Sequence, residues 1–446
     1  MVNDDRADYP MSFFIKIVLD GNLDQQCFQE SISQALQRHP LLLVRMTTKR
    51  FLKHWELSSS IPELQWMDSV EAPAGRDRFI NLRKESGLRM WGESDENQAT
   101  ILFQFHHALT DGVGAIQFIG DILAFYGQKT AGSEQEKPEL LDVDYEALRI
   151  RGQLWEPGHE HETLYRSVYR HLTEMLPVMP EELKSGSLSV SQPNSEKVSP
   201  FVSRIIEGKM LRSLKKVATK NNVTPNELYC GSLFQTLVKW NKRYGDVSEK
   251  QSFRVGMPFT LRTAAHQSIP AANVLSYVFI TQKVHEIANT DELLKIIHVL
   301  HNEAFELGDR SIMAWLMGLL QRIPGGFTAL ANAPYRFSTA MLANVADVKR
   351  QLRNRFPLHK GQCVAGNVEL VSLQGAAPVR PGTHLGLSLG TYAGRLFMNL
   401  NCSPQKFSVA QANEMADMFV DNLLEFVEEP ASRKLEVAPP NIVNVA

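Results

Sequence analysis

Two adjacent histidines, His106 and His107, are followed, after a gap of three residues, by Asp111 and Gly112. Histidine is the side chain that most readily exchanges a proton near neutral pH, and a fixed carboxylate can hold such a group in place. Either histidine alone is most simply explained as a hydrogen-bonded structural residue. Two histidines within one turn of an Asp-Gly pair instead indicate a general base together with its support.

The neighbouring segments predict where these residues lie. The run Ile101–Phe105 is apolar and rich in β-forming residues, whereas the apolar residues of segment 112–126 recur at helical spacing. Asp111 stands between them and is a residue type that caps helix N-termini. The sequence therefore predicts a strand, a polar turn and a helix. An ordinary N-cap explains Asp111 equally well at this point.

Length and composition exclude several classes of protein. The 446 residues exceed the usual size of a single core, so two domains or lobes are expected. The net charge of −2 does not indicate a nucleic-acid-binding protein. The four cysteines are far apart, which argues against a zinc site or a disulfide framework and favours a reducing, cytoplasmic setting. The first residues lack the basic start and apolar core of a signal peptide.

Two other motif matches in the sequence do not predict a functional site. Residues Gly386 to Gly390 match the G-x-S-x-G pattern of a nucleophile elbow, but they lie in alternating strand sequence, and the last histidine, His384, precedes them. The segment Gly112 to Gly114 follows a strand as a dinucleotide-binding loop would. The third glycine position of that fingerprint holds Gln117, so the match is incomplete.

The remaining histidines do not predict a metal site. Neither His298 with His301 nor His159 with His161 has a third ligand at a convincing spacing, so solvated helix faces or loops are expected. The most apolar window, Ile312–Leu320, is shorter than the roughly 20 residues of a membrane-spanning helix. It predicts a buried helix or a pocket wall, with a lipid channel or a membrane-surface contact as the alternative.

Helices and strands alternate along the rest of the chain. A strand over 41–46 and a helix over 76–85 are expected in the first half. The Ser- and Pro-rich segment 184–200 predicts a linker. The predicted organisation is an α/β protein with an N-terminal lobe over 1–183, this linker, and a C-terminal lobe over 201–446.

The stretch His106–Gly112 matches the HHxxxDG motif of the CoA-dependent acyltransferase superfamily. This group includes chloramphenicol acetyltransferase, condensation domains, and the wax ester synthase and alcohol acetyltransferase-like proteins. Four other segments resemble segments of the family and occur in the same order: Gly21–Met46, Thr224–Glu227, Met257–Arg262 and Leu387–Leu400. In the second of these, the acidic residue is Glu227 where the family has Asp. The DFGWG-like segment of plant BAHD enzymes is missing, which argues against that branch.

The resemblance implies two chloramphenicol acetyltransferase-like lobes of the α+β two-layer type, with a tunnel between them. It implies that His107 is the general base of an acyl transfer from a thioester to a hydroxyl or amine, without an acyl-enzyme. A helix N-terminus nearby is expected to keep this ring neutral. Asp111 is expected to pair with Arg262 from the other lobe. His106 is expected to be structural, and Gly112 to leave room for the pantetheine arm.

The same resemblance implies no bound cofactor and no metal, with acyl-CoA or acyl-pantetheine as co-substrate. Ser338 and Asn344 are candidates for an oxyanion or substrate contact. The expected acceptor is a small molecule or a lipid, with weak membrane-surface contact and without nucleic acid. The alternatives are a condensation-type enzyme that uses an acyl carrier protein, and a binding member of the family without catalysis. The acyl chain length and the acceptor are not predicted.

Overall fold

The structure is a computed structural model that describes residues 5–49, 52–73, 75–151, 175–185, 202–306 and 335–427, and isolated positions at 2, 154, 168–169, 173, 320, 323 and 325–326. The predicted linker from residue 186 onward and the apolar window up to residue 319 lie outside the described residues.

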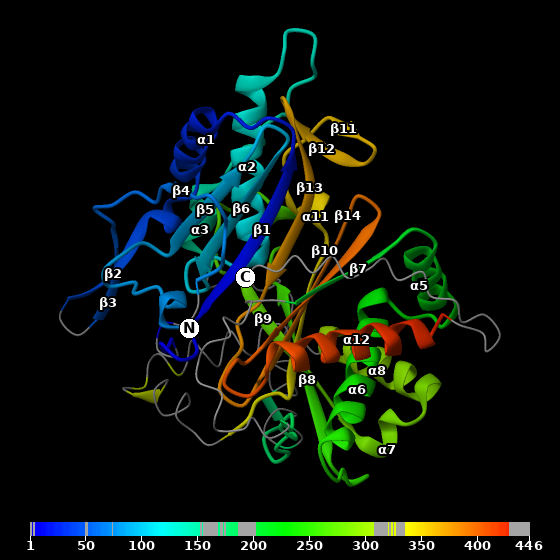
Figure 1. The fold of residues 1–446 in the computed structure, drawn as a ribbon. Helices are drawn as coiled ribbons and strands as arrows, with labels where there is room; N and C mark the ends of the chain where they lie inside the picture. Colours follow the sequence, from blue (N-terminus) through cyan, green and yellow to red (C-terminus); the bar gives the residue numbers. More distant parts are fainter. Residues whose placement is uncertain are drawn as a thin grey trace.

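A seven-stranded sheet forms the first lobe (Figure 1). Its strand order is β11-β12-β13-β1-β6-β5-β4. Helices α1 (Gln25–Arg38) and α2 (Gly112–Thr130) pack on one face. The strands are β1 (Ser12–Asp20), β4 (Leu64–Trp66), β5 (Leu88–Ser94), β6 (Gln98–His106), β11 (Leu358–His359), β12 (Gln362–Ala365) and β13 (Val368–Ala376).

The side chains of β1 alternate between the two faces of the sheet, which explains how the face under the helices is buried. Phe13, Ile15 and Ile17 point to the same side and join the core under α2, where Phe118 lies in the same cluster. The predicted strand over 41–46 begins later than expected: Pro40–Leu43 forms a 3-10 turn, η1, and β2 covers Val44–Lys49. The proline fits the first turn of a helix but not a sheet ladder.

The first half contains less helix than the sequence predicts. The helix expected over 76–85 is wrong, because only a 3-10 turn, η2 (Gly75–Arg78), forms there. Strand β3 (Leu52–Leu57) pairs with β2 in a separate two-stranded ribbon. A short helix, α3 (Tyr145–Arg149), follows α2.

A six-stranded sheet with order β7-β15-β14-β10-β8-β9 forms the second lobe. Its strands are β7 (Val202–Glu207), β8 (Ser252–Thr260), β9 (Leu275–Lys283), β10 (Ala340–Asp347), β14 (Leu385–Tyr392) and β15 (Arg395–Cys402). The helices around it in Figure 1 are α5 (Gly208–Lys220), α6 (Pro225–Arg243), α7 (Val284–Ile287), α8 (Thr290–Glu306) and α12 (Val409–Glu425). The short helix α11 (Val348–Gln351) follows β10. The G-x-S-x-G residues lie inside β14, as predicted, and not in an elbow.

The chain returns from the second lobe to complete the first sheet. Strand β13 pairs antiparallel with β1 through partners such as Ile17 and Leu373. Residues 358–376 therefore belong to the first sheet, and the predicted contiguous C-terminal lobe over 201–446 does not include this exchange. Pairing between distant segments of this kind leaves no signal in the local sequence.

Two other features concern function. Within the described ranges, no helix is long and apolar enough to cross a membrane. Within the same ranges, no group of three His, Cys, Asp or Glu side chains is placed to hold a metal ion.

Candidate active site

His106 is the last residue of β6, His107 follows it, and the two histidines have different surroundings. His106 is fully buried, and its Nε2 lies 3.0 Å from the Oδ2 of Asp5. Its Nδ1 accepts the backbone N–H of Ala108 at 3.1 Å. Both ring nitrogens are therefore bonded within the protein, which is the environment expected for a structural histidine.

His107 lies on the opposite side of the strand end, against the ring of Phe13 at 4.9 Å between centroids. It is partly buried. Burial lowers the pKa of His107 to about 4, and the charge of Asp111 opposes this shift. The ring is therefore neutral at pH 7, in the direction predicted. The main cause of the lowered pKa is burial, and not the helix N-terminus expected from the sequence.

Asn273, on the loop before β9, is the residue at this site that the sequence did not predict. Its side-chain Nδ2 donates to the carbonyl oxygen of His107 at 2.5 Å and lies 3.1 Å from Nδ1 of the same ring. The Oδ1 accepts the N–H of Leu275 at 3.3 Å, which orients the amide.

Two positions of the ring proton are consistent with the contacts of His107. Either Nδ1 accepts from Asn273, or Nδ1 carries the proton and donates to the carbonyl oxygen of its own residue. The second arrangement leaves Nε2 with a free lone pair, which is what a general base requires.

Asp111 caps α2 and also links the two lobes. Its Oδ1 accepts the N–H of Gly114 at 2.7 Å, while Oδ2 lies 2.6 Å from Arg262 and 2.8 Å from the N–H of Val274. The carboxylate is fully buried and is bonded to three donors. Both interpretations of Asp111, the N-cap and the ion pair, are therefore correct.

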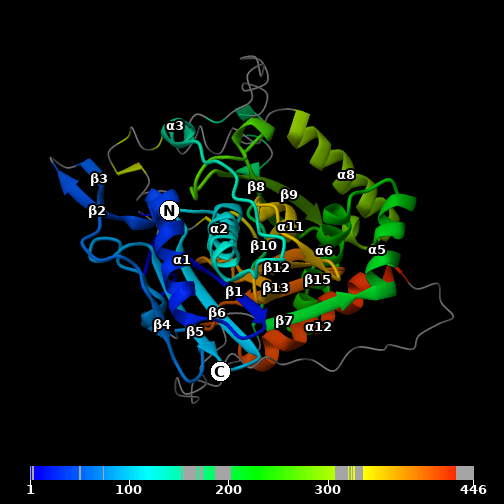
Figure 2. The same ribbon diagram turned by 90° about the horizontal axis from the view of Figure 1, so that it is seen from above.

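Arg262 completes this link from the loop after β8. Its guanidinium also donates to the carbonyl oxygen of Ala272 at 2.9 Å, and its side chain is 4% exposed. The predicted pairing with Asp111 across the lobes is confirmed. In Figure 2, α2 is drawn between α1 of the first lobe and strands β8 and β10 of the second lobe.

The two glycines at the start of α2 have different steric needs. A Cβ added at Gly114 would lie 2.9 Å from the backbone nitrogen of Ala272 and 2.5 Å from Oγ1 of Thr110. A Cβ at Gly112 would meet only Val345, at an ordinary 3.6 Å. Close approach of backbones therefore requires glycine at position 114. The room predicted at Gly112 is not filled by the protein.

The two oxyanion candidates do not lie together. Asn344 is next to Val345, which faces Gly112, and its side chain donates to Asn226 at 3.2 Å. Ser338 lies six residues earlier, about 20 Å away along an extended chain, and bonds Oγ1 of Thr383 at 3.1 Å. Asn344 is thus the candidate near the start of α2, and the oxyanion role of either residue stays a prediction.

The side chains of His298 and His301 are 39% and 17% exposed, so the predicted solvated face holds only in part for this pair. Their Nδ1 atoms lie 3.1 Å and 2.8 Å from the carboxylate of Glu227, and the pKa of this buried carboxyl is lowered to about 2. Hydrogen bonds from both rings and from the backbone of Thr224 outweigh the raising effect of burial.

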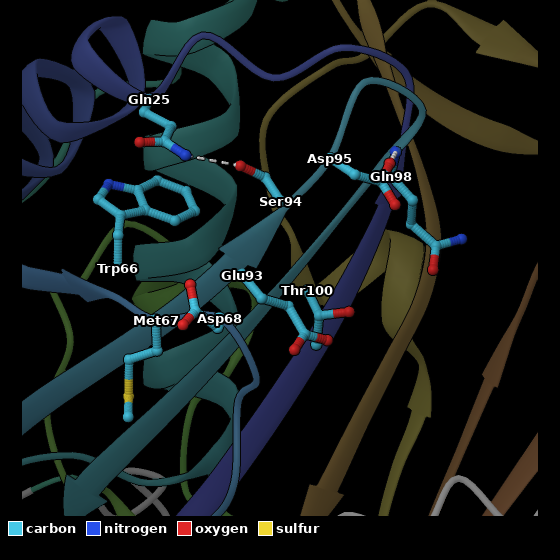
Figure 3. Close-up of a pocket in the computed structure, with 9 residues that line it drawn as sticks. All are labelled: Gln25, Trp66, Met67, Asp68, Glu93, Ser94, Asp95, Gln98 and Thr100. Carbon is cyan, nitrogen blue, oxygen red and sulfur yellow. Dashed lines mark hydrogen bonds between the residues drawn. The ribbon is translucent and has the colours of Figure 1, made fainter.

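A separate hollow of about 470 Å³ lies elsewhere on the first lobe. Figure 3 shows Trp66, Asp68, Glu93 and Asp95 around it at the β5–β6 hairpin. Its lining includes Gln98, eight residues before the end of β6, which is about 26 Å along a strand. This hollow is therefore not the site of His107.

Comparison with known proteins agrees with the motif. The family model of the condensation domain matches residues 1–269. The uncharacterized protein Rv2305 of Mycobacterium tuberculosis is 23% identical over 344 residues, which cover 71% of this chain and 72% of that protein.

Two solved structures illustrate the likeness in fold. The starter condensation domain of rhizomide synthetase RzmA, a mutant in complex with C8-CoA and Leu-SNAC, gives a TM-score of 0.67 at 11% identity, covering 96% of this chain and 91% of that chain. The TRI3 trichothecene 15-O-acetyltransferase from Fusarium sporotrichioides gives 0.66 at 11% identity, covering 94% and 91%. These likenesses confirm the predicted two-lobed, chloramphenicol acetyltransferase-like fold.

Proposed function

Because this chain belongs to the condensation-domain family, we propose that it transfers an acyl group from a thioester to a hydroxyl or amine, with His107 as general base. The observation that supports this most directly is the neutral, partly buried His107 ring, held by Asn273 at the junction of the two lobes. The intact motif argues against a binding member of the family without catalysis.

The proposed step needs one base and no acyl-enzyme. Nε2 of His107 takes the proton from the acceptor as its oxygen or nitrogen attacks the thioester carbonyl carbon. A new ester or amide bond forms, the C–S bond breaks, and the sulfur leaves as a thiol that takes up the proton from the ring. Asp111 and Arg262 do not touch the substrate in this scheme and fix the turn that aims the ring.

We propose acyl-CoA as the donor and a small-molecule or lipid acceptor. Two similar structures support this choice by what they contain or do: one was solved with C8-CoA, and the other is an O-acetyltransferase. Neither is more than 11% identical to this chain, so the acyl length and the acceptor must be found by experiment.

The test is a thiol-release screen with the purified protein. Acyl-CoAs of graded length are combined with mixed alcohols and amines, and released CoA is measured together with the product mass. Release that depends on an acceptor is the expected result. No release with any pair contradicts the proposal of a free acyl-CoA donor, and hydrolysis without an acceptor contradicts the proposal of transfer to a hydroxyl or amine.

The second candidate is a transfer from an acyl group on a carrier protein, and the family match itself favours it. In that case free acyl-CoA gives no turnover, whereas an acylated carrier or its pantetheine mimic does. A protein that responds to neither donor would be a binding member of the family.

A further inference from the structure

The loop Ala271–Val274 of the second lobe is bonded to the first lobe at every residue. Three of its residues contact the turn that contains the motif, through Asp111 or His107. The remaining residue, Ala271, contacts a different part of the first lobe: its N–H donates to Nδ1 of His39 at 2.7 Å. The other three contacts are Asp111 N–H to Ala272 O at 3.2 Å, Asn273 Nδ2 to His107 O at 2.5 Å, and Val274 N–H to Asp111 Oδ2 at 2.8 Å.

His39 follows the last residue of α1 and is fully buried. Because Nδ1 accepts from Ala271, the ring proton must be on Nε2, which faces Oδ2 of Asp121 at 3.1 Å. Protonating the ring would turn the acceptor toward Ala271 into a second donor. Burial lowers the pKa of His39 and so maintains the neutral form.

Asp121 is held firmly enough to fix this ring. Its carboxylate is fully buried and accepts from Arg38 at 2.6 Å, from Asn354 at 2.7 Å and from Arg353 at 3.2 Å. The rings of Phe118 and His39 also pack in a T-shaped arrangement, with 5.4 Å between centroids. The position of Nδ1 is thus set by α1 and α2 of the first lobe, on which the loop of the second lobe then rests.

We infer that His39 is a positioning residue. Its neutral ring fixes the position of the Ala271–Val274 loop relative to α2, so that Asn273 keeps the His107 ring in its orientation. This inference rests on the proposed function for its effect on turnover. A histidine that merely filled the core would need no contact with Ala271. Here Nδ1, the one acceptor of the neutral His39 ring, bonds Ala271, which is two residues before Asn273, the residue whose side-chain amide contacts His107.

Two substitutions separate the two ends of the ring. In His39→Asn the amide oxygen lies near the place of Nδ1 and can accept from Ala271. In His39→Gln the longer amide reaches the place of Nε2 and keeps the bond to Asp121, but the acceptor toward the loop is lost. We expect turnover of His39→Gln to fall about 100-fold, because small misplacements far from the reacting atoms have effects of this size. The KM for the donor should stay within about twofold.

His39→Asn should keep turnover within about threefold of the wild type, although it is less stable. Amide exchange followed by mass spectrometry on a peptide spanning 268–276 gives a readout that needs no substrate. Exchange should be faster in His39→Gln and unchanged in His39→Asn. The matched control is Tyr126→Phe, which removes the hydroxyl bonds to Asp24 and Asn367 without touching Asp121 or the contact with Ala271, and should lower stability without lowering turnover.

The inference is overturned if exchange at 268–276 is unchanged in His39→Gln, or if that variant keeps full turnover. It is also overturned if both variants and Tyr126→Phe lose turnover in proportion to their loss of stability. A wild-type protein that transfers no acyl group would contradict the proposed function instead. The exchange measurement would then still decide whether His39 holds the loop.

Discussion

Two helices begin near the junction of the lobes, and their N-termini are built differently. At α6 the cap is local: the Thr224 side chain accepts the N–H of Glu227 at 3.3 Å, and the Glu227 carboxylate accepts the N–H of Thr224 at 2.7 Å. The same carboxylate contacts His298 and His301, which lie on α8 of the same lobe.

At α2 only half of the cap is local. One oxygen of Asp111 bonds Gly114 three residues on, and the other bonds Arg262, 151 positions away. The comparison indicates that the end of α6 stabilises one lobe, whereas the end of α2 joins two lobes and fixes the turn that contains His107. Substitutions at the two ends should therefore differ in their effect on turnover more than in their effect on stability.

Asp111→Ala should have the largest effect of the substitutions at the two helix ends. It leaves Arg262 buried without its partner, which typically costs about 3–5 kcal/mol of the free energy of unfolding. Turnover per folded molecule should fall as well, because the turn next to His107 is no longer fixed. Urea denaturation and the thiol-release assay measure the two effects. Asp111→Asn, which can still cap α2, should lie between Asp111→Ala and the wild type.

The matched change at the other helix is Glu227→Gln, which keeps an acceptor for Thr224 but removes the charge facing the two histidines. It should lower stability while turnover per folded molecule stays within about twofold. Equal losses of turnover from Asp111→Asn and Glu227→Gln, at equal stability, would contradict the proposed difference between the two helix N-termini.

Gly114→Ala should have a smaller effect, confined to the junction. The new methyl group would meet the backbone of Ala272, and overpacking of this kind costs about 1–3 kcal/mol. Gly112→Ala is the control, because its methyl group meets only Val345 at normal distance. A loss of turnover in Gly112→Ala without loss of stability would support the predicted approach of the pantetheine arm. Equal destabilisation by both changes would contradict the steric account.

The pH dependence should distinguish the base from an ordinary histidine. Since burial lowers the pKa of His107 to about 4, kcat/KM should stay flat through pH 6.5 and fall only as the pH approaches 4. Stability should already decline between pH 6.5 and 4, because the unfolded chain binds a proton that the folded ring does not. An acid limb at pH 6.5 in a protein shown to remain folded would mean that the ring is not desolvated.

Short-range features of the site were predictable from sequence. The helical period after Asp111, its capping oxygen and the Thr224-Pro225 start of α6 all depend on residues within one or two turns. The partner Arg262 was predicted from the family resemblance, since no local pattern connects positions 151 residues apart.

The remaining contacts could not be predicted because they arise only when the lobes meet. Asn273 touches His107 across 166 positions and His39 touches Ala271 across 232, and neither pair has a periodicity or a motif. For the same reason the exchange of β11–β13 into the first sheet was missed. The steric need at Gly114 comes from the backbone of this same loop.

The most direct test of the central claim is acyl transfer by His107→Ala, compared with the wild type by thiol release at equal concentrations of folded protein. Removal of a general base should lower turnover by about 10²- to 10⁴-fold while circular dichroism and the urea midpoint stay close to those of the wild type. Full turnover by the folded variant would contradict the assignment of His107 as the base.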